Sequence, residues 1–211
     1  MLRAGEVYEN PVTGERAVIR IGTDVTNGEL LIVDLTVRPG GAVMGEHTHP
    51  AMEERFTMMA GKMGFRVAGK EETATAGVQI IAAPGTPHDW WNAGDKDVLV
   101  RVEMRPAARF EEMIRNGFGL AQDGKTDGKG KPGLLQLALF AQEFDDALQF
   151  TKPPRWVQKL LFGVLAPIAR MAGLRGSYDE YLKRGPKEIV AVEPMELPED
   201  IAKKLGLTVG A

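Results

Sequence analysis

The three histidines are the residues whose type and spacing best suit chemistry. His47 and His49 are two positions apart, and side chains at i and i+2 of a β-strand point to the same face, so both imidazoles can reach one ion. The third, His88, follows a turn-forming stretch at 84–87. A lone histidine is usually a surface or hydrogen-bonded core residue, but here the whole supply falls in two short segments. The pattern therefore indicates a metal site built at the edges of two strands.

Composition limits both the ligands and the partners of such a site. The chain has no cysteine, which excludes disulfides, iron–sulfur clusters and thiolate–zinc sites and leaves nitrogen and oxygen ligands. A net charge of -3 gives no basic field of the kind that nucleic-acid binding needs. The N-terminus has no signal-like apolar region, and the most apolar run, 160–169, is half of the roughly 20 residues that cross a bilayer. We therefore expect a cytoplasmic protein with no membrane span.

The first half of the sequence predicts short β-strands. Ala17–Ile21 and Leu30–Val37 are rich in β-branched residues and are flanked by turn-forming glycines, prolines and asparagines. In Val98–Met104, apolar and charged residues alternate, which predicts a half-buried strand. Further short strands are expected at 56–59, 63–67 and 78–81. Many short strands at regular spacing are typical of a sandwich or barrel.

After Pro106 the sequence pattern changes from predicted strands to predicted helices. Helices are predicted at Pro106–Asn116, with Gly117 just past its end, at Leu134–Phe150 and at Pro154–Ala172. The predicted organisation is a β-domain over 1–106 (core 15–106), a helical extension over 107–186 with a flexible linker at 121–133, and a tail over 187–211. The amphipathic run Trp156–Leu174 has basic residues at its ends, and we expect it to cover a core rather than to lie on a membrane surface.

The spacing around the first histidine pair follows a known motif, G-x5-H-x-H-x3,4-E-x6-G. Here it reads Gly41, five residues, His47-x-His49, four residues, Glu54, six residues and Gly61, and every position matches. In this respect the chain resembles the cupin superfamily, of the single-domain, metal-binding type with a conserved barrel. The resemblance implies a mainly β fold, a single cupin β-barrel (jelly roll) with a C-terminal helical appendage.

The second motif of that superfamily, G-x5-P-x-G-x2-H-x3-N, also has a counterpart. Gly77, Gly85, His88 and Asn92 stand at the matching positions, and the one departure is that the proline lies at 84 instead of 83. The two motifs and their flanking strands cover roughly residues 15–106, so the resemblance says nothing about the predicted helices.

The resemblance implies one divalent transition metal on His47, His49, Glu54 and His88. Glu54 is preferred to its neighbour Glu53 because only Glu54 is followed, after six residues, by a glycine. Three imidazoles and one carboxylate suit iron, manganese, nickel, copper, cobalt or zinc, and they do not select one of them. The second motif also places two residues near the metal, Asn92 and Asp89, either of which could hold an imidazole through a hydrogen bond.

The same strands predict a pocket beside the metal. If His88 points inward, Trp90 does too, and Phe56 and Met58 follow Glu54 with the same period of two. Met44 and Met104 are expected to complete a rather apolar wall for a small-molecule substrate.

Three functions remain open at this point. The first is an oxidoreductase, dioxygenase-like, that acts on a small apolar or aromatic molecule, with Glu54 doubling as a catalytic base. The second is a non-redox isomerase, cyclase or lyase that uses the metal as a Lewis acid. The third is a non-catalytic cupin that binds a small molecule. Because cupins commonly dimerise, we expect a homodimer.

Overall fold

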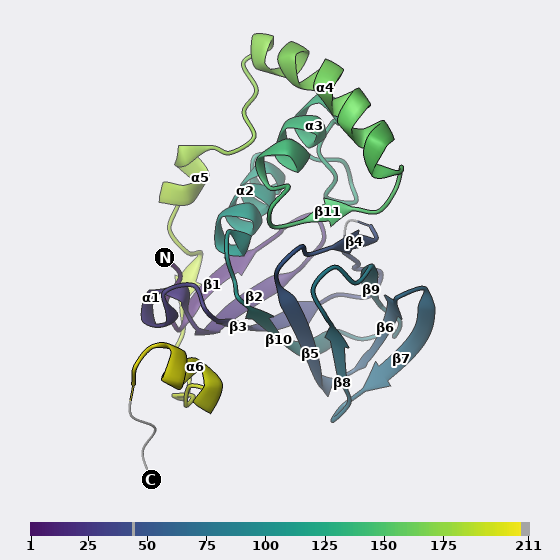
Figure 1. Cartoon of the computed structure of the whole chain (residues 1–211). Helices are drawn as coiled ribbons and strands as arrows, with labels where there is room; N and C mark the ends of the chain where they lie inside the picture. Colours follow the sequence, from purple (N-terminus) through teal and green to yellow (C-terminus); the bar gives the residue numbers. More distant parts are fainter. Residues whose placement is uncertain (44, 208–211) are drawn as a thin grey trace.

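The computed structural model describes residues 1–43 and 45–207, and it contains two antiparallel β-sheets with the three longest helices on one side (Figure 1). The strands are β1 (Glu6–Glu9), β2 (Arg16–Ile21), β3 (Leu31–Val37), β4 (His47–Thr48), β5 (Glu53–Ala60), β6 (Lys62–Val67), β7 (Lys70–Thr75), β8 (Gln79–Ala82), β9 (His88–Asn92), β10 (Val98–Arg105), β11 (Gln149–Phe150) and β12 (Glu188–Ile189). The helices are α1 (Thr23–Thr26), α2 (Phe110–Gln122), α3 (Leu134–Glu143), α4 (Arg155–Met171), α5 (Asp179–Lys183) and α6 (Glu199–Lys204).

The larger sheet has the strand order β12-β1-β2-β3-β10-β5-β8, and the smaller one has the order β11-β4-β9-β6-β7. The predicted alternation in β10 is confirmed, because Val98, Val100, Val102 and Met104 are all buried while the residues between them are half-buried. Inward-facing side chains of both sheets form one hydrophobic core, with large contributions from Phe56. Burial of these alternating apolar faces is what drives the two sheets together.

The expected closed barrel is not formed in the described residues, because the two sheets share no strand. The chain passes from one sheet to the other at tight corners, Gly61 between β5 and β6 and Gly77 between β7 and β8, both with positive φ (+83° and +87°). A side chain at Gly61 would also press on the backbone of Val98, at 3.0 Å. The motif glycines therefore turn corners between two sheets, and the backbone ladder is interrupted there.

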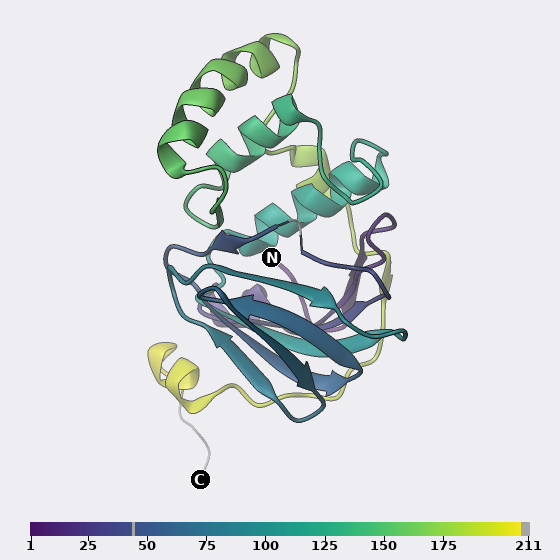
Figure 2. The same ribbon diagram turned by 90° about the vertical axis from the view of Figure 1, so that its right-hand side faces the viewer.

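Helices α2, α3 and α4 lie in successive layers on one side of the sheets (Figures 1 and 2). Helix α2 begins four residues later than predicted and continues past Gly117 to Gln122. Within this helix Gly119 faces the ring of Tyr181, where a Cβ would lie 2.4 Å from the ring, so close packing requires a glycine there. None of the described helices is both long enough and apolar enough to cross a membrane.

The segments around the helices return to both sheets. After α3, β11 pairs with β4, so that Phe150 lies opposite His47. Thr151 continues this contact, and its backbone N–H donates to the carbonyl of Glu46 at 3.1 Å. In the tail, Ile189 of β12 lies opposite Glu6 of β1. The helical extension is thus tied to the strand that carries the first two histidines.

Candidate metal centre

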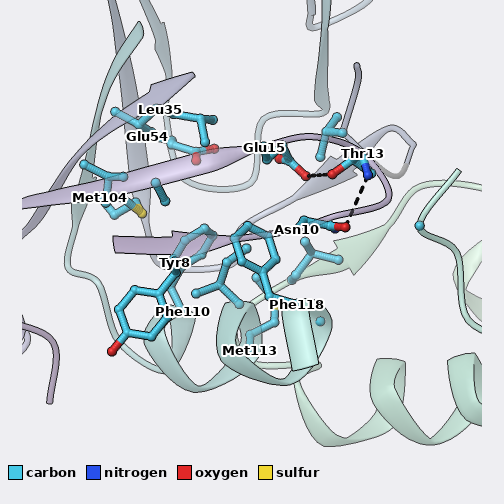
Figure 3. Close-up of a pocket in the computed structure, with 18 of the residues that line it drawn as sticks. Tyr8, Asn10, Thr13, Glu15, Leu35, Glu54, Met104, Phe110, Met113 and Phe118 are labelled. Carbon is cyan, nitrogen blue, oxygen red and sulfur yellow. Dashed lines mark hydrogen bonds between the residues drawn. The ribbon is translucent and has the colours of Figure 1, made fainter. Parts of the chain in front are cut away.

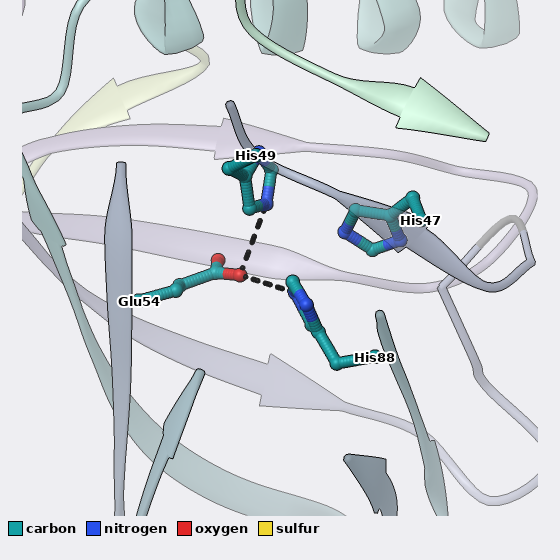
Figure 4. A group of neighbouring side chains, drawn as sticks. All are labelled: His47, His49, Glu54 and His88. Atoms are coloured by element: carbon teal, nitrogen blue, oxygen red, sulfur yellow. Dashed lines mark hydrogen bonds and ion pairs between the residues drawn. The ribbon is translucent and has the colours of Figure 1, made fainter. Parts of the chain in front are cut away.

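The three histidines and Glu54 meet between the two sheets (Figure 4). His47 on β4 lies directly opposite His88 on β9, and His49 follows β4 by one residue. Glu54 comes from β5 of the other sheet and reaches across. All four side chains are buried, and their candidate ligand atoms lie within 4.8 Å of one another.

The structure also separates Glu54 from its neighbour. Glu53 points the other way and is ion-paired with Arg55 at 2.6 Å. Glu54 Oε2 instead lies 3.0 Å from His88 Nε2 and 3.2 Å from His49 Nε2. Alternation along β5 produces this difference, and it agrees with the choice made from the spacing to Gly61.

Backbone carbonyls orient all three imidazoles through Nδ1. The pairs are His47 with Gly45 at 2.9 Å, His49 with Ala147 at 2.7 Å and His88 with Thr86 at 2.9 Å. Since a carbonyl can only accept, each Nδ1 carries the proton and donates, which leaves Nε2 as the free lone pair of each neutral ring. The imidazoles are therefore held in the tautomer that presents Nε2 to an ion.

The side chains that the sequence suggested for this supporting role have other partners. Asn92 donates its amide to the carbonyls of Val37 and Lys96, at 2.8 and 2.9 Å. Asp89 is ion-paired with Arg66 at 3.0 Å. The expectation that Asn92 or Asp89 holds an imidazole is therefore wrong. The nearby backbone satisfies Nδ1 instead, and Ala147, which holds His49, comes from a loop 98 residues away.

Burial and mutual proximity set the charges of the cluster. Burial, together with the neighbouring His88 and His49, lowers the pKa of His47 to about 3, so His47 is neutral near neutral pH. Burial alone would raise the pKa of the Glu54 carboxyl, but the contacts with His49 and His88 outweigh it and the pKa is lowered. Burial opposes charge on His88, yet the Glu54 carboxylate raises the pKa of that imidazole.

These residues fit a metal ion. A neutral His88 with its proton on Nδ1 would place a bare Nε2 lone pair 3.0 Å from a carboxylate oxygen, which is repulsive unless a cation lies between them. His49 Nε2 is likewise buried without a hydrogen-bond partner among the described residues. Separations of 3.0 and 3.2 Å suit ligand atoms that share one ion at bond lengths of about 2.0–2.2 Å. A proton would satisfy one such pair, whereas a metal ion satisfies all four groups.

The cluster opens into a cavity of about 170 Å³ that lies between the larger sheet and helix α2 (Figure 3). His47 and Glu54 are in its wall, and of the predicted pocket residues Phe56, Trp90 and Met104 line it as well. The lining side chains are mostly apolar, in line with the expected apolar pocket.

Two of the predicted pocket residues do not appear in this wall. Met58 is packed in the core between the sheets and is not part of the lining. Met44 lies outside the described residues.

Sequence reasoning missed the far end of this cavity, where Asn10, Thr13 and Glu15 line the wall. A signal for Glu15 was present, since it shares the period of two with Ala17 and Ile19, which are buried in the core. An acidic residue on the inward stripe of a strand is a marker of a site. No signal in the sequence indicates the carbonyl of Ala147, because every residue carries one.

Comparison with known proteins places this geometry in a family. The family model for the cupin domain matches residues 33–103. This part of the chain is a cupin domain. No curated protein matches the sequence.

Among solved structures, the chain is similar to a predicted oxalate decarboxylase from Thermotoga maritima, with 20% identity, 49% of this chain and 92% of that chain covered, and a TM-score of 0.43. It is also similar to KdgF from Halomonas sp. (18% identity, 44% and 78% covered, TM-score 0.39). A third likeness is to a sugar phosphate isomerase of the cupin superfamily from Silicibacter pomeroyi (19% identity, 49% and 69% covered, TM-score 0.40).

Proposed function

We propose that this cupin is a mononuclear metal enzyme of the oxidoreductase type, dioxygenase-like, acting on a small and largely apolar organic molecule. One observation carries the proposal. In the wall of an apolar cavity, three Nε2 lone pairs and one carboxylate point at one another, and a cation bound between them would remove their mutual repulsion. Four ligands leave open positions on a six-coordinate metal, and a redox-active ion bound there would supply sites for substrate and dioxygen together.

The chain's own residues have distinct parts in this proposal. Glu54 brings one negative charge to three neutral imidazoles, and the contacts that lower its pKa make it a good ligand and a poor proton acceptor. We therefore assign Glu54 as a ligand and not as the catalytic base. Phe56 and Trp90 form apolar walls beside it, which orient an apolar substrate and exclude water from the ligand set. Phe110, at the start of α2, closes over His49 with its ring centroid 6.2 Å from the imidazole.

The test is the metal content of untagged, chelator-free protein, followed by oxygen uptake with apolar phenols and alcohols. We expect about one equivalent of iron, manganese, nickel, cobalt or copper and substrate-dependent oxygen consumption. Glu54→Gln should lose both, whereas the matched control Glu53→Gln should keep both, because Glu53 points away from the cluster. One equivalent of zinc without oxygen uptake would favour Lewis-acid chemistry. Failure to retain any metal after reconstitution would sink the proposal.

A further inference from the structure

The cavity has a polar end opposite the metal cluster, built by the hairpin of β1 and β2 (Figure 3). Asn10 follows Tyr8 on the inward face of the first arm, and Glu15 precedes Ala17 on the inward face of the second. The backbone N–H of Asn10 donates to the carbonyl of Glu15 at 3.0 Å, so these two side chains sit on neighbouring chain segments. Thr13 lies in the turn between them.

The strand registers separate this end from the metal cluster. Met104 of β10 lies opposite both Glu54 and Leu31. Arg16, next to Glu15, lies opposite Thr36. The two rows are therefore five residues apart along β3, or about 16 Å at the rise of a β-strand. A ligand that touches both ends must be elongated, and a cavity of about 170 Å³ requires it to be narrow.

Glu15 and Asn10 could each form further hydrogen bonds at this end of the cavity. Glu15 Oε2 accepts a bond of 2.6 Å from the Thr13 hydroxyl, and Glu15 forms no ion pair with any described residue. Asn10 Oδ1 accepts from the backbone N–H groups of Val12 and Thr13, at 3.0 and 3.2 Å. That contact fixes the amide and directs Nδ2 elsewhere, where it donates to no group in the described chain although Asn10 is only 6% exposed.

The surroundings make this unused capacity costly. Burial raises the pKa of the Glu15 carboxyl, and the Thr13 hydroxyl offsets this only in part. A loop closes over the same end: Gly130, with φ of +77°, lies so near that a Cβ there would be 2.8 Å from Thr13 and 3.7 Å from Asn10 Nδ2. Asn10 Nδ2 and the Glu15 carboxyl face the cavity, and a ligand that forms hydrogen bonds with them there gains affinity.

We infer that Glu15 and Asn10 bind a hydroxyl group at the end of an elongated apolar ligand whose other end reaches the metal cluster. A hydroxyl matches the pair because it donates to the Glu15 carboxylate and accepts from Asn10 Nδ2 in the same position. An ammonium group cannot accept from Asn10, and a carboxylate is repelled by Glu15. The inference deepens the proposed function by naming the substrate class, an ω-hydroxylated apolar chain, and only the orientation toward the metal rests on that function.

The experiment measures dissociation constants by calorimetry for the full chain, both metal-loaded and metal-free. Fluorescence of Trp90, in the cavity wall, reports occupancy. The probes are straight-chain medium-length carboxylic acids and their ω-hydroxy and ω-amino counterparts. We expect the ω-hydroxy acid to bind roughly tenfold more tightly than the plain acid of equal length.

Variants assign this preference to the polar end. Glu15→Leu and Asn10→Leu should bring the ratio of the two affinities to about one without weakening the plain acid. Glu15→Gln keeps the shape of the side chain and should lower the ratio of the two affinities. This variant replaces Glu15→Leu in the test if the leucine variant does not fold. Glu9→Gln is the matched control, because Glu9 faces outward on the same hairpin and pairs with Lys187.

Each outcome decides the inference. Equal affinity for plain and hydroxylated acids, preference for the ω-amino acid, a ratio that survives in Glu15→Leu, or no binding of any probe would overturn it. The preference for hydroxyl in a protein that retains no metal would refute the proposed function and leave this inference standing.

A second and independent feature is the outer face of α4. Trp156, Leu160 and Val164 recur every four residues and are 71%, 67% and 59% exposed, and Met171 at the end of the helix is 86% exposed. The opposite face carries Phe162, which packs on α3. Helix α4 is the outermost layer of the molecule (Figure 2). Its most apolar large side chains are thus turned away from the protein, contrary to the expectation that this helix covers a core with them.

The charges around this face point to one partner. The segment 152–176 has five basic residues and no acidic one. Lys152 and Arg155 are paired with Glu46 and Asp145, whereas Lys159 and Arg175 form no ion pair with any described residue. A second copy docked on the same face would bring like charges together, whereas an anionic lipid surface complements them. We propose that α4 lies on an anionic membrane surface, with its apolar stripe inserted at the level of the headgroups.

Vesicle sedimentation tests this second proposal. The full chain should bind vesicles of phosphatidylcholine with phosphatidylglycerol, bind pure phosphatidylcholine much more weakly, and lose binding in high salt. Trp156→Gln with Leu160→Gln should reduce binding at least tenfold, and Ile81→Gln, an exposed apolar residue on β8, should not change it. No binding, or a double variant that changes only the oligomeric state in ultracentrifugation, would overturn the proposal.

Discussion

The two ends of the cavity each contain a carboxyl group, and their environments drive the two groups in opposite directions. Glu54 is buried, but it faces two imidazoles, and its pKa is lowered. Glu15 is enclosed too, but its one side-chain partner is the neutral hydroxyl of Thr13, and its pKa is raised. Burial opposes the charge of both carboxyls, although Glu15 is only half-buried, so the partner decides whether the carboxylate is favourable. The Glu54 end of the cavity therefore suits a bound cation, whereas the Glu15 end suits a ligand that donates a hydrogen bond.

The largest expected effect comes from removing an imidazole at the metal end. His88→Ala should weaken metal binding by more than about 100-fold, since loss of a ligand exceeds the 10–100-fold cost of losing a supporting hydrogen bond. Metal content and competition with a chelator give the measurement. The variant should leave the hydroxyl preference of the metal-free protein intact. If metal affinity changed less than tenfold, the contrast between the two ends would be lost.

The same substitution at both carboxyls should change stability with opposite signs in metal-free protein. Glu54→Gln should destabilise the fold by about 2 kcal/mol at neutral pH, because in metal-free protein it removes the charge-assisted hydrogen bond with His88, whose pKa the carboxylate raises. Glu15→Gln should stabilise it by about 1 kcal/mol, because it removes a poorly compensated buried charge. Urea unfolding measures both.

The pH dependence of these two effects follows from linkage. The pKa of Glu54 is lowered on folding, so its contribution is present above the ordinary value of 4.5 and is lost as the pH falls through the folded-state pKa. The pKa of Glu15 is raised, so the contribution of this carboxyl to stability is most favourable below 4.5 and is lost as the pH rises through the folded-state pKa. The gain from Glu15→Gln should therefore vanish in acid. Equal signs at neutral pH would refute the comparison.

A smaller effect tests how far the metal end depends on the helical extension. Thr151→Pro removes the backbone donor that ties this segment to Glu46, beside the His47 strand. We expect about tenfold weaker metal binding because the loop that carries the Ala147 carbonyl is loosened from His49. Thr151→Ala keeps the backbone N–H and should remain within about twofold of wild type. Equal affinities for the two variants would mean that the extension does not position the imidazoles.

The smallest expected effect is at Asp89, which the sequence had suggested as a support for the metal ligands. Asp89→Asn removes an ion pair with Arg66 near the surface, for which we expect a change of stability below about 1 kcal/mol. Metal affinity should stay within about twofold of wild type in the same chelator assay. A tenfold loss would show that Asp89 acts on the centre after all.

Most of the β-fold and the candidate metal ligands could be predicted from local sequence patterns. The spacing of His47, His49 and His88 on short strands is local information, since a strand's period of two fixes which side chains face inward. The same rule identified Trp90 and Phe56 as cavity residues, although it also placed Met58 there, which the structure buries in the core instead. The resemblance predicted a closed barrel, which is not formed in the described residues, because closure depends on how the chain turns at corners such as Gly61 and not on any single strand.

The groups that support and complete the site could not be predicted, because they come from distant parts of the chain. The carbonyl of Ala147 reaches His49 across 98 residues, and a carbonyl carries no side-chain identity that a sequence pattern could reveal. Glu15 and Glu54 face one cavity because β2 and β5 lie on the same sheet with β3 and β10 between them. Local periodicity assigns a side chain to a face, but which distant groups share that face is set by strand order and packing, which form only when the whole chain folds.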